Sequence, residues 1–535
     1  MAFEKFLERH VATVESLEKE SALAYWHATL SGKRADFQRY SQLHLNLESV
    51  YMNRDEFEYV RSVRDSGEIM DPRLKRMADI LYLRYLGNQA DPVCIQRIIS
   101  LGSTVENKFS TFRAVVDGQR LFFNDVLRIL HDESDCSKRR RTWEASKEVG
   151  RIVLSDLMEL IRLRNEVARQ IGFENYYTMS LTLGEIEEGE LERVFRELEE
   201  MTREPYRAMK EEIEETITRR YGITTDEIMP WHYSDPFLQE AQRFDDIDVD
   251  GFFRDRSVVE IARDFYEGVD LPVDDIIERS DLFEQEGKYP HAYCTDIDRQ
   301  GDIRILANCK NNNHWMETML HELGHGVYDK HIDRSLPFLL RKYPHLCATE
   351  ASAMYFGRLA QDPFWMSAAL GLGERQVRRL TPKIKKLLRQ KQLVFSRWCQ
   401  TMFHFERALY RDPEQDLNGL WWDIVERYQF AQRPSGRNEP DWATKIHIIA
   451  SPVYYHNYML GEMIASQIHS HVASCVLGCA PHNVEVYGSR EVGTYFREIV
   501  YRPGNVLPWS KHIEQATGEP LTAGHFVRQF VKESD

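Results

Sequence analysis

The chain has 535 residues, of which 42% are hydrophobic and 29% are charged, and these proportions are typical of folded globular proteins. Its formal net charge of −16 argues against a nucleic-acid-binding protein, because phosphate recognition requires a basic surface. The sequence contains no run of about 18 apolar residues, so we expect neither a transmembrane helix nor a membrane partner.

The first ninety residues are predicted to form helices, because apolar residues recur at helical spacing with charged residues between them. The segment Met1–His10 is charged and amphipathic, which is not typical of a secretion signal. The eight cysteines are scattered without a metal-binding pair. We therefore expect free thiols and a cytoplasmic location.

Further amphipathic helices are predicted from residue 121 to residue 172, and a long charged helix from residue 185 to residue 220. Two strands are then predicted at Tyr289–Ile297 and Asp302–Asn308, joined around Asp298–Gly301 as a hairpin. An extended peptide could add itself as a strand along the outer edge of this hairpin.

The hairpin runs into the motif His321-Glu322-Leu323-Gly324-His325. On a helix, His321 and His325 are one turn apart, so both imidazoles leave the same face. Two imidazoles and a third protein ligand, with one position left for water, are typical of a catalytic zinc site. Glu322 projects about 100° away from His321, where a general base would meet that water. The alternative is a pair of buried core histidines.

Glu350 is the predicted third zinc ligand, because it lies in an apolar helical segment that could form a second helix beside the first. His331 is the rival, since it follows His325 at the spacing used in metzincins. That arrangement needs a glycine where Tyr328 stands, and Gly326 comes two residues too early. We therefore expect His331 to be an exposed histidine away from the metal.

A second polar and aromatic cluster extends from Lys445 to Tyr458. Pro452 is expected in the first turn of a helix, which would place Tyr455 and Tyr458 on one face. By itself the cluster is typical of a core helix with surface tyrosines. Beside a zinc site, His447 and a tyrosine hydroxyl would donate hydrogen bonds to the oxyanion formed in peptide hydrolysis.

These motifs together resemble the angiotensin-converting-enzyme family of zinc peptidases, and also the thimet oligopeptidase and oligoendopeptidase F families. The likeness is strongest in residues 289–360 and 445–461 and extends over most of the chain. Its other elements are Ala24-Tyr25-Trp26, Trp143, Gly150-Arg151, residues 164–177, Pro508-Trp509 and Thr517–Leu521.

The resemblance implies a mainly α protein in which two helical lobes surround a long, deep cleft, with a short β-hairpin next to the zinc helix. It implies one peptidase unit over residues 1–535. Within that unit we expect a lid and N-terminal helices at about 1–120, a helical lobe at 121–288, and the zinc-site and C-terminal lobe at 289–535.

The resemblance also implies roles for individual side chains. His447 and Tyr458 would stabilise the transition state, and His291 and Ala292 would hold the substrate backbone. Lys445 and Tyr455 would meet the C-terminal carboxylate of a peptide. The tyrosine interval is one residue longer than in converting enzymes, so Tyr454 competes with Tyr455 for this role.

Two other positions depart from converting enzymes. Met354 stands where they favour an acidic residue near the zinc, so support for the ligands must come from elsewhere, and Asp329 is a candidate. Asn457 stands where they have an arginine that helps to bind chloride, so the sequence does not predict whether chloride activates the enzyme.

We therefore expect a zinc-dependent oligopeptidase that binds one Zn²⁺ per chain and hydrolyses short peptides. The longer tyrosine interval favours an endo-acting enzyme over a peptidyl-dipeptidase or carboxypeptidase that releases C-terminal residues. A non-catalytic peptide-binding protein is the alternative from another class. A homo-oligomer is compatible with the sequence, and no nucleic-acid partner is expected.

Overall fold

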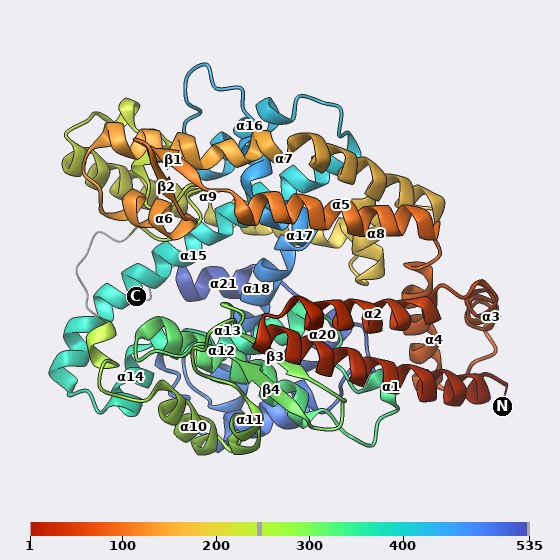
Figure 1. Ribbon diagram of the computed structural model, residues 1–535. Helices are drawn as coiled ribbons and strands as arrows, with labels where there is room; N and C mark the ends of the chain where they lie inside the picture. The colour runs from red at the N-terminus through yellow and green to blue at the C-terminus, as the bar shows by residue number, and fades with distance from the viewer. Residues whose placement is uncertain (1, 243–248, 532–535) are drawn as a thin grey trace. The chain divides into compact units, whose positions relative to one another are not determined.

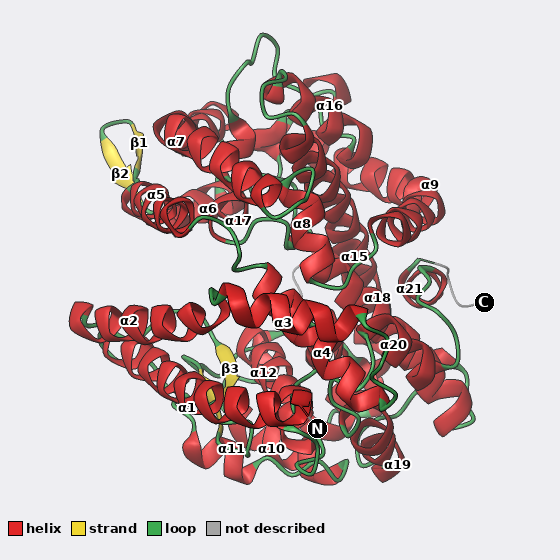
Figure 2. Cartoon of the chain, turned by 90° about the vertical axis from the view of Figure 1, so that its right-hand side faces the viewer, coloured by secondary structure: helices red, strands yellow, loops and turns green. Residues whose placement is uncertain are grey.

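The computed structural model describes residues 2–242 and 249–531, and it confirms the mainly α fold. Two short antiparallel hairpins are the β-structure of these residues (Figures 1 and 2). Backbone contacts divide the chain into two compact units. Unit 1 comprises Met1–Gln89, Asp248–Ile384 and Leu460–His525, and unit 2 comprises Ala90–Ile247, Lys385–Met459 and Phe526–Asp535. Each unit thus combines segments that are distant in the sequence.

Unit 1 contains the β3–β4 hairpin and most of the helices at the two ends of the chain. Its elements are α1 (Ala2–Ser31), α2 (Arg34–Tyr51), α3 (Arg54–Asp65), α4 (Pro72–Leu86), α10 (Val258–Gly268), α11 (Asp274–Arg279), β3 (Tyr293–Asp296), β4 (Ile303–Leu306), α12 (Asn313–His331), α13 (Leu346–Gly357), α14 (Pro363–Leu370), α19 (Arg490–Tyr495) and α20 (Trp509–Thr517).

Unit 2 is built around long helices from the middle of the chain. Its elements are α5 (Pro92–Thr111), β1 (Ala114–Val116), β2 (Gln119–Leu121), α6 (Phe123–Asp132), α7 (Cys136–Gln170), α8 (Tyr176–Leu183), α9 (Glu188–Tyr221), α16 (Leu417–Gln429) and α17 (Ile446–Ala450). Three further helices, α15 (Glu374–Arg411), α18 (Tyr455–His471) and α21 (Gly524–Phe530), begin in one unit and end in the other.

Helix α12 forms the centre of unit 1, where α10, α13 and the β3–β4 hairpin contact it (Figure 1). It begins after Asn312, whose side chain accepts a hydrogen bond from the backbone of Trp315. The guanidinium of Arg334 donates to the carbonyl oxygens of Asp329 and Lys330 in the last turn, which otherwise lack helical partners. The apolar stripe of this helix, formed by Met316, Met319, Leu320 and Leu323, is buried. The Tyr266 hydroxyl also donates to the Leu320 carbonyl oxygen at 2.6 Å.

The predicted hairpin is confirmed, with strands shorter than expected. Tyr293 pairs with Leu306 and Asp296 with Ile303 in an antiparallel register. The turn between them is stabilised by the Asp298 carboxylate, which accepts hydrogen bonds from the backbone of Gln300 and Asp302. On its other edge β4 makes a parallel bridge from Leu306 to Asp281, so β3 is the freer edge of this sheet.

The start of α18 differs from the expectation for Pro452. The helix begins at Tyr455, three residues later, because the chain between α17 and α18 turns sharply. Val453 adopts φ +55°, and its backbone N–H donates to the carboxylate of Glu406 at 2.8 Å. Tyr455 and Tyr458 nevertheless share one face of α18, with ring centroids 5.4 Å apart.

None of the described helices combines the length and the apolar character that crossing a membrane would need.

Candidate metal centre and substrate residues

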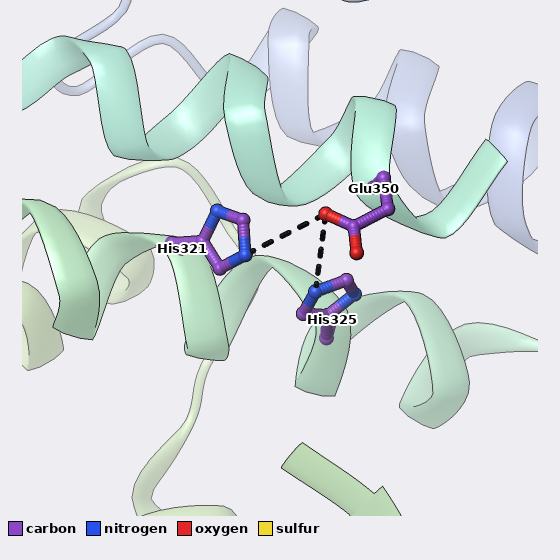
Figure 3. Close-up of side chains that lie close together, drawn as sticks. All are labelled: His321, His325 and Glu350. Carbon is purple, nitrogen blue, oxygen red and sulfur yellow. Dashed lines mark ion pairs between the residues drawn. The ribbon is translucent and has the colours of Figure 1, made fainter. Parts of the chain in front are cut away.

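Three side chains of unit 1 converge at one place, and they are the three predicted zinc ligands (Figure 3). His321 and His325 come from α12, and Glu350 comes from α13. The Glu350 Oε2 atom lies 3.7 Å from His321 Nε2 and 4.0 Å from His325 Nε2. One ligand atom from each residue lies within 4.8 Å of the others.

The close approach of α12 and α13 brings the histidines and the glutamate together. Gly324 lies between the two histidines, and a Cβ at this position would be 2.8 Å from the Cα of Ala353 on α13. The Ser352 hydroxyl donates to the Gly324 carbonyl oxygen at 2.9 Å and is also hydrogen-bonded to the Tyr501 hydroxyl. Small residues at the crossing therefore set the distance between the two ligand-bearing helices.

The donor set fits a zinc ion. Ligand atoms about 2 Å from a common tetrahedral ion lie roughly 3.4 Å from one another, slightly closer than the 3.7 and 4.0 Å found here. Burial lowers the pKa of His325 well below its usual value, and the neighbouring His321 lowers it further. His325 is therefore a neutral imidazole, which is the form that binds metals. Its Nδ1 atom is 2.7 Å from the Thr349 hydroxyl.

Glu322 is buried beside this cluster, with 7% of its surface exposed. Burial and, after it, the Glu350 carboxylate raise its carboxyl pKa to about 8, although a hydrogen bond with the backbone of Cys294 opposes both. A bound divalent cation would also oppose them by favouring the carboxylate. Glu322 thus has a proton affinity that its surroundings can change, as a group that accepts and releases a proton requires.

One expectation about α12 needs correction. His331 is half-buried rather than exposed: its Nε2 atom is buried without a hydrogen-bond partner, and its ring stacks on Tyr501. Burial lowers its pKa to about 4. His331 is not part of the metal-ligating cluster among the described residues. The outer nitrogen of His325 contacts the Thr349 hydroxyl, and the role of Asp329 as a support for the ligands stays a prediction.

His291 and Ala292 lie in the short segment before β3, also in unit 1. The Asn308 side chain donates to the carbonyl oxygens of Tyr289 and Pro290, at 3.0 and 3.2 Å, and thereby fixes the start of this segment. His291 is exposed and Ala292 is half-buried. The two residues therefore precede the freer edge of the hairpin.

Lys445 belongs to unit 2 and is not a solvated lysine, since only 7% of its surface is exposed. Its ammonium donates to the Gln239 side-chain oxygen at 2.6 Å and lies over the rings of Phe237, Trp398 and Tyr455. Burial lowers its pKa to about 8, while the carboxylates of Asp235 and Glu240 act in the opposite direction.

His447 and the tyrosines of α18 lie next to Lys445 in unit 2. The His447 ring centroid is 4.8 Å from Tyr455 and 6.3 Å from Tyr458. Burial, and then the Lys445 ammonium, lower the His447 pKa to about 4, so the imidazole is neutral. Its Nδ1 atom is buried without a hydrogen-bond partner. Tyr455 is the tyrosine whose ring meets Lys445, whereas Tyr454 packs on Tyr458 at 5.1 Å.

Three residues that the sequence did not single out support these groups. Gln239 meets the Lys445 ammonium, and the buried Asp235 carboxylate accepts backbone hydrogen bonds from residues 237, 239 and 240. Thr349 meets His325. Gln239 and Asp235 lie some 200 residues from Lys445 in the sequence and carry no motif, but Thr349 directly precedes the predicted ligand Glu350.

Comparisons with known proteins point in one direction. The sequence profile of a family described as angiotensin-converting enzyme matches residues 1–233 and 250–532. The angiotensin-converting enzyme-related protein of Drosophila melanogaster is 24% identical over 242 residues, which are 43% of this chain and 38% of that protein. The match thus covers less than half of the length of this relative.

Proposed function

Because the chain belongs to the angiotensin-converting enzyme family, we propose that it is a zinc peptidase that hydrolyses peptide bonds in short peptides. The observation that carries the proposal is the convergence of His321, His325 and Glu350 beside the buried carboxyl of Glu322. These three side chains would hold the ion, and the ion would supply a Lewis acid that polarises the scissile carbonyl and acidifies a water molecule.

Glu322 is the general base in this proposal. Its carboxylate takes a proton from the attacking water and then gives that proton to the nitrogen of the leaving amine. The water oxygen forms the new bond to the carbonyl carbon, and the carbon–nitrogen bond breaks as the amine becomes protonated. The raised pKa of the buried carboxyl suits both halves of this proton transfer.

His447 and Tyr458 are proposed to stabilise the oxyanion that forms from the scissile carbonyl. A neutral imidazole has one N–H to donate, and the Tyr458 hydroxyl has one O–H. Hydrogen bonds that strengthen as charge develops lower the transition state more than the ground state. His291 and Ala292, next to the hairpin edge, are proposed to hold the substrate backbone as an added strand.

The tyrosine interval favours endo-acting cleavage. The surroundings of Lys445 instead support cleavage near the C-terminus of the peptide. A buried ammonium with a single hydrogen-bond partner side chain is suited to pairing with a free carboxylate. Lys445, Gln239 and Tyr455 would then anchor the C-terminus of the peptide. The enzyme would release a short C-terminal fragment, as a peptidyl-dipeptidase or carboxypeptidase does. We favour this C-terminal cleavage over endo-acting cleavage.

A mixed peptide library tests the proposed function. Protein loaded with zinc should cleave short peptides, and removal of the metal with a chelator should abolish cleavage until zinc is added back. The masses of the products identify the bond that is cut. If the zinc-loaded protein binds peptides without cleaving any of them, it is a peptide-binding protein rather than an enzyme.

The choice between the two modes is tested with one peptide and its C-terminal amide. An anchored carboxylate predicts that the amide is cleaved several-fold more slowly, and that Lys445→Ala removes the difference. Equal cleavage of both forms would return the assignment to an endo-acting oligopeptidase, whose relatives cut without such an anchor.

Other aspects of the function stay predictions. A cytoplasmic location is supported by eight cysteines that all carry free thiols. Peptides are the proposed partners, and a homo-oligomer is compatible with them.

A further inference from the structure

We propose that Thr349 is a positioning residue of the metal centre, which holds the His325 imidazole in the orientation that points Nε2 at the ion. The inference rests on the proposed zinc site and assigns a residue outside its ligand set. It gives one ligand a support in a chain whose Met354 stands where converting enzymes favour an acid.

The contact between Thr349 and His325 carries the proposal. The Thr349 Oγ1 atom lies 2.7 Å from His325 Nδ1, while His325 Nε2 lies 4.0 Å from the Glu350 carboxylate. One nitrogen of the ring therefore meets the hydroxyl, and the other faces the remaining ligands. Since only 3% of the Thr349 surface is exposed, the hydroxyl has little access to water as an alternative partner.

A hydroxyl at this position has a property that a carboxylate lacks. When Nε2 binds a metal, the neutral imidazole carries its proton on Nδ1, and the Thr349 oxygen must accept that hydrogen bond. When no metal is bound, the proton can reside on Nε2, and the hydroxyl can then donate to Nδ1. Thr349 can thus hold the ring in one orientation in both states, because it is both a donor and an acceptor.

Thr349 also directly precedes Glu350 on α13. The same turn of helix therefore supplies one metal ligand and the support for another, which links the orientation of His325 to the position of Glu350. A hydrogen-bond partner of a ligating histidine typically changes metal affinity by about 10- to 100-fold. We expect the effect of Thr349 to fall in this range.

The test replaces the hydroxyl and measures zinc affinity rather than turnover. Thr349→Val keeps the shape of the side chain and removes the hydroxyl, and Thr349→Ser keeps the hydroxyl. The Kd for zinc is measured on metal-free protein by competition with a chromophoric chelator. Thr349→Val should weaken binding by about 10- to 100-fold, and Thr349→Ser should stay within a few-fold of the original chain.

Thermal unfolding of the metal-free proteins separates positioning from folding. Thr142→Val is the matched control, because Thr142 is equally buried, donates to the Lys138 carbonyl oxygen and belongs to unit 2. It should leave the Kd for zinc unchanged. The Tm of metal-free Thr349→Val should differ from that of the original chain by no more than the Tm of metal-free Thr142→Val does.

Three outcomes would overturn the assignment of Thr349. They are an unchanged Kd in Thr349→Val, equal weakening in the serine and valine variants, and weakening that accompanies a large loss of metal-free Tm. The proposed zinc site fails in a different way, since the original chain itself would then bind no zinc.

Discussion

At the scale of single residues, Glu322 is the side chain on which turnover should depend most. Glu322→Gln keeps the size of the side chain and the three metal ligands but removes the proton acceptor. We expect turnover to fall by about 10²- to 10⁴-fold with unchanged zinc content. Steady-state kinetics and metal analysis of the purified variant measure both quantities.

Glu317 offers a matched control for this variant, because it lies on the same helix and contacts the Gln361 side chain. Glu317→Gln should turn over peptides at nearly the original rate. A Glu322→Gln variant with near-original turnover would show that another group is the base.

Lys445 gives the enzyme a predicted dependence on alkaline pH. Its pKa of about 8 lies below the usual 10.5, so the ammonium loses its proton as the pH rises through about 8. The anchoring of a free carboxylate should weaken over the same range. We therefore expect kcat/KM for a free-acid peptide to fall relative to its amide above pH 8, because kcat/KM reports ionisations of the free enzyme.

The same pKa shift has an opposite effect on stability. The unfolded chain binds more protons than the folded chain between about pH 8 and 10.5, so Lys445 favours folding increasingly as the pH rises through this window.

Lys445→Gln is the control for the kinetic prediction. It should remove the pH dependence of the ratio between kcat/KM for the free-acid peptide and kcat/KM for its amide. A ratio that falls equally in this variant would assign the ionisation to another group.

At the scale of elements, the crossing of α12 and α13 is the feature that the metal centre depends on. Gly324→Ala would place a methyl group 2.8 Å from the Cα of Ala353, and neither backbone can move without the other. Overpacking of this kind typically costs about 1–3 kcal/mol, and here it would also separate the histidines from Glu350. We expect a lower free energy of unfolding and weaker zinc binding, measured by denaturant titration and chelator competition.

Gly102 on α5 provides the control for a glycine within a helix. Its Cβ position has no heavy atom within 4 Å, so Gly102→Ala should stabilise the helix by roughly 0.5–1 kcal/mol through reduced backbone entropy. Zinc binding should not change. If Gly324→Ala binds zinc as tightly as Gly102→Ala, the helix crossing does not set the ligand geometry.

Local sequence predicts the elements of the metal centre well. The spacing of His321 and His325 and the apolar stripe behind them are properties of one helix, and the hairpin before it has its own turn residues. The break between α17 and α18 is different. It depends on a hydrogen bond from Val453 to Glu406 in α15, and the pattern around Pro452 contains no sign of that partner.

At the scale of the whole molecule, the cysteines allow a simple prediction. All eight carry free thiols, and they are Cys94, Cys136, Cys294, Cys309, Cys347, Cys399, Cys475 and Cys479. Titration of unfolded, unreduced protein with a thiol reagent should therefore recover eight thiols per chain. A lower number that returns to eight after reduction would indicate disulfides formed in an oxidising compartment.

The division into units could not be predicted from the sequence. The boundary at Gln89 and Ala90 lies in a short connection between α4 and α5 like others in the chain, and α15 and α18 continue through other boundaries. Helix periodicity reports which face of a helix is buried but not which distant helix covers it. For the same reason Gln239 and Asp235 were missed, although they meet or support Lys445.

The three-segment construction of unit 1 has a consequence for how the protein is made. A ribosome synthesises all three proposed zinc ligands by the time it reaches Glu350, but the last segment of their unit ends only at His525. At the usual speed of translation this interval lasts on the order of 10–35 s. During that time the apolar faces of α12 and α13 lack their final cover, including Tyr501, which holds Ser352 at the helix crossing. A chain that stops before residue 460 lacks this whole segment, and we expect that it does not complete the proposed zinc site.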